Sequence, residues 1–269
     1  MKGPGYFNSV EPIWLYRRRY LVLDHWLSMH TLVIVPTYNE IENIQAFLDQ
    51  VLSVTPPEVE VLVVDDGSPD GTGKLVMSLG QENPRIHLLE RTRKLGLGLA
   101  YVAGFKWGIT GGYDALIEMD ADFSHHPKYL PPMLDYLKQY DFVIGSRYVK
   151  GGGTVNWGLS RKFISRAGSF YSRTILGAPI WDFTGGFNGW NRKVLTSIEL
   201  DTIRSDGYSF QIELKYRSFS KGFEFFEFPI VFEDRRVGQS KMSNKIVFDA
   251  VLKVWEFRSL PRSGLENST

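Results

Sequence analysis

The segment Ile117-Glu118-Met119-Asp120-Ala121-Asp122 places two carboxylates, one residue apart, at the end of an apolar run that is typical of a buried strand. Unpaired carboxylates are costly to bury, so we expect a cation to meet Asp120 and Asp122. A divalent metal fits best, because Mg²⁺ and Mn²⁺ take oxygen ligands and usually share them with a substrate's phosphates. Taken alone, an Asp-x-Asp pair is equally typical of a strand that ends in a solvated acidic turn.

Three other apolar runs also end in polar residues. Residues 31–35 precede Pro36-Thr37-Tyr38-Asn39-Glu40, residues 61–64 precede Asp65-Asp66, and residues 142–144 precede Gly145-Ser146-Arg147. The segments between them are long enough for crossover helices, and in the first we expect Asn39 to cap a helix that Pro56-Pro57 ends. The alternation predicts a single-domain α/β protein with a Rossmann-like, mostly parallel sheet and helices on both faces.

This topology would bring distant residues together. Right-handed crossovers put the carboxyl ends of parallel strands on one edge of the sheet, where ligands of open α/β sheets bind. Pro36, Asp66, Asp122 and Arg147 should therefore converge in one cleft.

Eight motifs stand out along the chain. Four of them follow the apolar runs: Val35-Pro36-Thr37-Tyr38-Asn39-Glu40, Asp65-Asp66-Gly67-Ser68-Pro69-Asp70-Gly71-Thr72, Asp120-Ala121-Asp122 and Gly145-Ser146-Arg147-Tyr148. Four others are Ser124-His125-His126-Pro127, Arg161-Lys162-Phe163-Ile164-Ser165-Arg166, Asp182-Phe183-Thr184-Gly185-Gly186-Phe187 and Asp234-Arg235-Arg236-Val237-Gly238-Gln239-Ser240-Lys241. In this order and spacing, the first four resemble glycosyltransferase family 2, and the second four narrow the resemblance to its dolichol-phosphate (polyprenyl-phosphate) mannose synthases.

The resemblance implies a GT-A fold and transfer of mannose, with inversion, from GDP-mannose to the phosphate of dolichol or another polyprenyl phosphate. Carried over by position, the nucleoside would be held by Pro36, Tyr38, Glu40, Val64 and Asp66. The diphosphate and a Mg²⁺ or Mn²⁺ ion would be met by Asp120, Ala121 and Asp122, with Ser124 standing where some relatives have a metal-binding Gln. The pocket for the sugar and the two phosphates would be lined by Arg147, Arg161, Arg235 and Lys241. The catalytic residues would be Asp122, Arg147 and Arg235.

The chemistry of transfer between two phosphorylated substrates independently requires carboxylate metal ligands and cationic side chains. A leaving nucleoside diphosphate carries negative charge that a metal at Asp122 and nearby Arg and Lys side chains would stabilise. A phosphate monoester has a second pKa of roughly 6, so the acceptor is already an anionic nucleophile and needs no strong general base. Planar Arg side chains suit phosphate oxygens. Arg161 and Arg166 could instead lie on an exposed helix face, and Arg166 is left out of the predicted site. The glycines of Gly151-Gly152-Gly153-Thr154 would suit a mobile acceptor loop.

Composition agrees with one catalytic domain. The chain has 269 residues, a net charge of +1 and no cysteine, which argues against nucleic-acid binding and excludes disulfides. We assign residues 29–262 to the catalytic domain and 263–269 to a tail. Residues 1–28 are either a basic aromatic segment that touches lipid or an extension outside the fold, and we favour the extension.

No run reaches the roughly 18 consecutive apolar residues of a membrane span. We therefore expect a peripheral enzyme on the cytosolic face of a membrane, with a possible membrane-embedded partner subunit. The last helix is a candidate for lipid contact, but its apolar stripe, Ile246, Val247, Ala250, Val251, Val254 and Trp255, would equally suit packing on the sheet. Two alternatives remain open: a family 2 transferase with another donor such as UDP-glucose, and a non-catalytic subunit that binds a nucleotide sugar.

Overall fold

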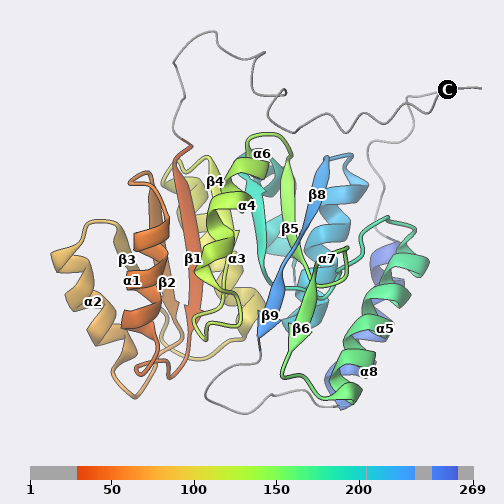
Figure 1. Ribbon diagram of the computed structural model, residues 1–269, viewed down its shortest axis with the longest axis horizontal. Coiled ribbons are helices and arrows are strands. Elements are labelled where there is room, and N and C mark those ends of the chain that lie inside the picture. Colours follow the sequence, from red (N-terminus) through yellow and green to blue (C-terminus); the bar gives the residue numbers. More distant parts are fainter. Residues whose placement is uncertain (1–28, 204, 234–243, 260–269) are drawn as a thin grey trace, which may run out of the picture.

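A seven-stranded sheet forms the centre of the protein (Figure 1). The computed structural model describes residues 29–203, 205–233 and 244–259. In spatial order the strands are β3 (Ile86–Glu90), β2 (Val59–Asp65), β1 (Thr31–Thr37), β4 (Ala115–Glu118), β7 (Asn188–Asn191), β5 (Phe142–Ser146) and β8 (Phe225–Pro229). Only β7 runs antiparallel to its neighbours, so the prediction of a mostly parallel sheet is confirmed.

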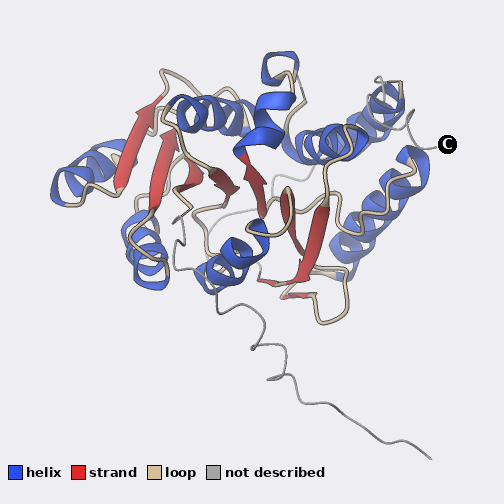
Figure 2. Cartoon of the chain, turned by 90° about the horizontal axis from the view of Figure 1, so that it is seen from above, coloured by secondary structure: helices blue, strands red, loops and turns tan. Residues whose placement is uncertain are grey.

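Helices cover both faces of this sheet (Figure 2). Alternate residues of β1 point to opposite faces, so Leu32 and Ile34 belong to one core cluster and Val33 and Val35 to the other. The first cluster is closed by α3 (Leu97–Thr110), α6 (Arg192–Ser197) and α7 (Gly207–Ser220). The second is closed by α1 (Ile44–Val54), α2 (Thr72–Glu82) and α4 (Leu130–Leu137).

The remaining elements lie at the β8 end of the sheet. Helices α5 (Leu159–Leu176) and α8 (Asn244–Arg258) pack against each other, and α8 also packs against α7 (Figure 1). The short strands β6 (Gly153–Val155) and β9 (Val231–Glu233) form a separate parallel pair. Two single-turn helices, Pro127–Tyr129 and Leu200–Thr202, complete the described chain.

The structure corrects one prediction from the helical patterns and describes part of a helix whose role the sequence left open. The first helix begins at Ile44 and not after Asn39, which adopts a left-handed backbone conformation with φ 63° and belongs to the preceding loop. For the last helix, the sequence leaves sheet packing and lipid contact open. In the structure α8 packs on α5 and α7, and of its described side chains Val254 is buried in the first core cluster while Trp255 is 53% exposed. Within the described residues, no helix is both long and apolar enough to span a membrane.

Candidate functional site

The turns after β1 and β2 are tied together by Asp65. The Thr37 hydroxyl donates to Asp65 Oδ1 (2.8 Å), and Ser68 donates its hydroxyl to Oδ1 (2.6 Å) and its backbone N–H to Oδ2 (2.9 Å). Because its carboxylate accepts these three hydrogen bonds, Asp65 stabilises the turn after β2. The neighbouring Asp66 carboxylate accepts from Leu95 N (3.2 Å) and lies 2.8 Å from Arg91 Nη1, which joins it to the loop before α3.

The loop after Tyr38 is fixed by hydrogen bonds to side chains of residues 68–72, which follow β2. The backbone N–H groups of Asn39, Glu40 and Ile41 donate to Ser68 Oγ, Thr72 Oγ1 and Asp70 Oδ2, at 3.0, 3.0 and 3.1 Å. These bonds pair the backbone amides of the loop, and the left-handed φ of 63° at Asn39 keeps that residue outside the helix. Tyr38 remains 37% exposed, with Lys94 Nζ 3.7 Å from its ring centroid. The loop therefore presents a planar aromatic surface beside Asp66.

Asp120, the first carboxylate after β4, is held by two buried side chains. The Tyr101 hydroxyl donates to Asp120 Oδ1 (3.1 Å), and the Asp120 backbone N–H donates to His125 Nδ1 (3.3 Å). Burial raises the pKa of Tyr101, as does the charge of Asp120, and burial lowers the pKa of His125. Tyr101 therefore keeps the proton that it donates, and His125 stays neutral and accepts.

Asp122 sits in a tight turn that also buries a hydroxyl. Its Oδ1 accepts from Ser124 N (3.0 Å), and the intervening Phe123 has a left-handed φ of 61°. Ser124 Oγ is buried and has no hydrogen-bond partner among the described residues. A buried hydroxyl without a partner is costly, and one beside two carboxylates fits an oxygen-ligated cation or its water shell. No set of three or more carboxylate or imidazole groups in the described chain could hold a metal by itself.

Arg147, which follows β5, is held by Asp182. Its Nε and Nη2 donate to Asp182 Oδ2 (2.8 Å) and Oδ1 (2.7 Å), its backbone N–H donates to Oδ2 (2.9 Å), and Nη2 also donates to Thr184 Oγ1 (2.9 Å). Burial alone would lower the pKa of Arg147, but the Asp182 carboxylate outweighs burial and raises it. This two-point ion pair fixes the guanidinium and offsets much of its charge.

The loop that carries Asp182 is supported by buried groups. Lys215, fully buried in α7, donates to the carbonyls of Asp182 (2.9 Å), Phe183 (3.2 Å) and Gly185 (2.7 Å), and burial lowers its pKa to about 8. In the adjoining network Asn188 Nδ2 donates to Glu118 Oε2 (2.6 Å), and burial raises the pKa of Glu118 to about 7. The sheet interior thus positions the loop opposite Arg147.

A basic pocket opens beside Arg147. Its cationic side chains are Arg147, Lys150, Lys162 and Arg166, and the loop of Gly151, Gly152 and Gly153 forms one wall. A Cβ on Gly152 would lie 2.5 Å from the Ser146 carbonyl oxygen, so only glycine lets the loop approach the end of β5 this closely. Such a pocket suits an anion. Arg161 lies outside this lining and stacks on Trp157, with 4.1 Å between its Cζ and the ring centroid.

The structure brings most of the predicted site residues to one edge of the sheet. Pro36, Asp66, Asp122 and Arg147 all lie at or just beyond the carboxyl ends of their strands. Val64 and Ala121 are buried with their side chains in the core, so they could meet a ligand only through the backbone. Arg235 and Lys241 lie outside the described residues. Ligand roles for these residues stay predictions.

Other residues of the site were missed by the sequence reasoning. Lys150, Lys162 and Arg166 line the basic pocket, although the sequence reading kept Arg161 and set Arg166 aside. Helical spacing around Arg161 could have placed Lys162 and Arg166, but nothing in the sequence says which side of α5 faces a pocket. Asp182 begins one of the eight motifs, but only the structure shows that it pairs with Arg147.

Residues 32–198 match the sequence profile of glycosyl transferase family 2. The chain belongs to this family. One family 2 relative, an undecaprenyl-phosphate mannosyltransferase from Micrococcus luteus, is 49% identical over 226 residues, which cover 84% of this chain and 93% of the relative. A polyprenol monophosphomannose synthase from Mycolicibacterium smegmatis is 47% identical over 232 residues, or 86% and 87% of the two chains.

Solved structures agree on the fold. Glucosyl-3-phosphoglycerate synthase from Mycobacterium tuberculosis, in complex with Mn²⁺, UDP and glucosyl-3-phosphoglycerate, has a TM-score of 0.65 at 18% identity and covers 88% of this chain and 83% of its own. A mannosyltransferase from Pyrobaculum calidifontis in complex with GDP-Man and Mn²⁺ has a TM-score of 0.54 at 20% identity, covering 78% and 58%. This family 2 chain thus has the GT-A fold that the resemblance implied.

Proposed function

We propose that the protein transfers mannose from GDP-mannose to the phosphate of a polyprenyl phosphate, with inversion at the anomeric carbon and with Mg²⁺ or Mn²⁺ bound. The observation that supports this most is an identity of 47–49% to two relatives named for polyprenyl-phosphate mannose transfer, across most of each chain. The GDP-Man and Mn²⁺ in the Pyrobaculum mannosyltransferase support the donor and the metal more weakly, because that likeness concerns the fold.

The donor would lie along β1, β2 and β4. Tyr38 offers a face on which a base can stack, and the Asp66 carboxylate can accept hydrogen bonds from the base. Asp120 and Asp122 would hold the metal with the diphosphate, and the Ser124 hydroxyl would gain a partner there. When bound, the metal supplies positive charge that offsets the charge of the departing diphosphate.

The acceptor phosphate would lie in the basic pocket. Two phosphorylated substrates repel each other, and Lys150, Lys162 and Arg166 would offset that repulsion. Arg147, whose charge is largely offset by Asp182, would contribute less. In the reaction a phosphate oxygen of the acceptor forms a bond to the anomeric carbon, and the bond from that carbon to the β-phosphate oxygen of the donor breaks. GDP leaves with the bonding electron pair, and no side chain needs to remove a proton from the acceptor.

We propose that the protein binds peripherally to the cytosolic face of a membrane, where it could also meet a membrane-embedded partner subunit. The support comes from α5, where Leu159, Phe163 and Phe170 are 84%, 75% and 69% exposed. Their spacing of four and seven residues puts them on one helix face. Lys162 and Arg166 flank this apolar face, and both line the basic pocket. Such a face suits an anionic lipid surface, and it would bring the pocket to the acceptor.

Transfer assays with a short, water-soluble prenyl phosphate test this function. We expect the full chain to form prenyl phosphomannose from GDP-mannose, to do so only with Mg²⁺ or Mn²⁺, and to use UDP-glucose much less well. Equal or better transfer from UDP-glucose would replace the proposed donor. Binding of both nucleotide sugars without transfer would favour a non-catalytic subunit.

A further inference from the structure

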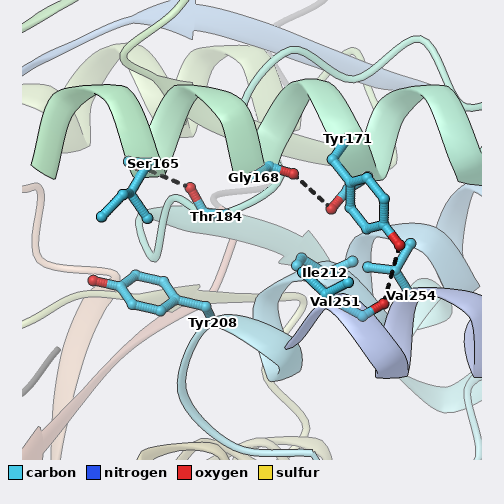
Figure 3. Close-up of a pocket in the computed structure, with 10 residues that line it drawn as sticks. Ser165, Gly168, Tyr171, Thr184, Tyr208, Ile212, Val251 and Val254 are labelled. Atoms are coloured by element: carbon cyan, nitrogen blue, oxygen red, sulfur yellow. Dashed lines mark hydrogen bonds between the residues drawn. The ribbon is translucent and has the colours of Figure 1, made fainter. Parts of the chain in front are cut away.

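A second, apolar pocket lies between α5, α7 and α8 (Figure 3). One side is formed by Ile164, Ser165, Gly168 and Tyr171 of α5, and the other by Ile212 of α7 with Val251 and Val254 of α8. Its surface is almost entirely apolar. We call it the helix crevice. None of the residues assigned to the donor contributes to it.

Two features keep the helix crevice open. The Tyr171 hydroxyl donates to the Val251 carbonyl (3.2 Å), which bridges α5 and α8 across the crevice (Figure 3). Gly168 stands in the middle of α5, where a Cβ would meet nothing closer than Thr184 Cγ2 at 3.8 Å. No close contact therefore requires a glycine there, and glycine inside a helix lowers its stability. Its effect on the structure is to leave space in the crevice.

The helix crevice and the basic pocket share no lining residue, but hydrogen bonds connect the lining of one to that of the other. Ser165 lines the crevice, accepts from the Tyr148 hydroxyl (2.7 Å) and lies 3.2 Å from Thr184 Oγ1. Thr184 lines the crevice as well and accepts from Arg147 Nη2 (2.9 Å). Tyr148 and Arg147 line the basic pocket. Two small buried hydroxyl side chains, Ser165 and Thr184, thus stand between the apolar crevice and the cationic pocket.

We propose that the helix crevice binds the isoprene units next to the phosphate of the acceptor, while the phosphate lies in the basic pocket. This inference rests on the proposed function. A polyprenyl phosphate is an anionic phosphate joined to a long apolar chain. The basic pocket matches the phosphate, and the neighbouring helix crevice matches the first part of the apolar chain. The crevice would then select prenyl phosphates over small phosphates that fit the basic pocket equally well, because each buried methylene raises affinity about fourfold.

The test compares geranyl phosphate with n-propyl phosphate, in solution and without vesicles. Calorimetry gives the affinity of each probe in the presence of GDP and Mn²⁺, and transfer assays with GDP-mannose give kcat/KM. For the wild type we expect geranyl phosphate to bind at least about tenfold more tightly than n-propyl phosphate. Gly168→Leu fills the crevice and should remove that preference while leaving n-propyl phosphate and GDP binding unchanged. Ala167→Leu puts the same side chain on the neighbouring exposed position and should keep the preference.

A second matched pair guards against misfolding of Gly168→Leu. Val251 is 38% exposed at the crevice and Leu252 is 55% exposed outside it, so serine at either position should fold, and only Val251→Ser should weaken geranyl phosphate binding. Equal binding of both probes by the wild type would overturn the crevice proposal, as would an unchanged preference in Gly168→Leu or Val251→Ser. A clear preference in binding without any mannose transfer would leave the crevice standing and refute the proposed function.

Discussion

Replacing Asp182 by Asn should cost about 3–5 kcal/mol of the free energy of unfolding, because it removes one partner of a buried ion pair. The carboxylate is fully buried and accepts four hydrogen bonds, from Arg147 N, Nε and Nη2 and from Gly185 N, at 2.7–2.9 Å. An amide keeps a single acceptor oxygen and turns an NH₂ group toward these donors. Arg147 would then be a buried charge without a counter-charge.

The assay is urea unfolding at neutral pH, followed by circular dichroism. Asp135→Asn is the matched control, since Asp135 pairs with Lys138 at 2.9 Å but its side chain is 72% exposed, and loss of that pair should cost at most about 0.5 kcal/mol. A double variant, Arg147→Met with Asp182→Leu, should recover part of the loss because no charge stays buried. If Asp182→Asn unfolds within about 1 kcal/mol of the wild type, the argument from the buried charge is refuted.

The same pair fixes the direction of a pH effect. Burial alone would raise the pKa of Asp182, but Arg147 outweighs burial and the pKa is lowered. A carboxyl whose pKa is lower in the folded state adds stability above its unfolded pKa of about 3.9, and that stability is lost as the pH falls through the folded value. The wild type should therefore lose its advantage over Asp182→Asn in acid. An advantage that grew in acid would contradict this sign.

The remaining predictions concern the reaction. Asp122→Asn should remove most turnover with an unchanged melting temperature, and turnover within about threefold of the wild type would rule out a metal ligand there. Arg235→Ala should lower transfer about 100-fold or more in single-turnover assays while GDP binding by calorimetry falls much less, and an equal fall in both would make Arg235 a donor ligand. A chain that starts at Met29 should turn over a detergent-dispersed acceptor as the full chain does. A large loss confined to a liposomal acceptor would instead identify residues 1–28 as a membrane contact, which salt should weaken.

How far the sequence predicts the fold depends on where each element's stability comes from. β1 and β2 are rich in β-branched residues, and β4 and β5 are short apolar runs, so the pattern of these four strands is local and predictable. β7 reads Asn188-Gly189-Trp190-Asn191, which has no strand pattern, and its backbone is held between β4 and β5. Its existence depends on partners far along the chain.

The site shows the same limit. The sequence indicated Asp66, Asp122 and Arg147, because each stands where an apolar run stops. It could not show that Arg147 is already paired, since Asp182 lies 35 residues away. Nor could it choose between Arg161 and Arg166, which lie on the same helix and differ only in whether they line the basic pocket.

Among the described strands of the main sheet, β7 alone is antiparallel to its neighbours, and it separates two parallel parts. On one side β3, β2, β1 and β4 form an uninterrupted parallel block that carries Tyr38, Asp66 and Asp122. On the other side, β5 and β8 carry the loops that lead to α5 and α8. Insertions or substitutions beyond β7 leave the strand register of the first block untouched. If the first block binds the nucleotide and the β5 side binds the acceptor, as proposed above, the acceptor side can change without altering the strand register on which the proposed nucleotide site is built.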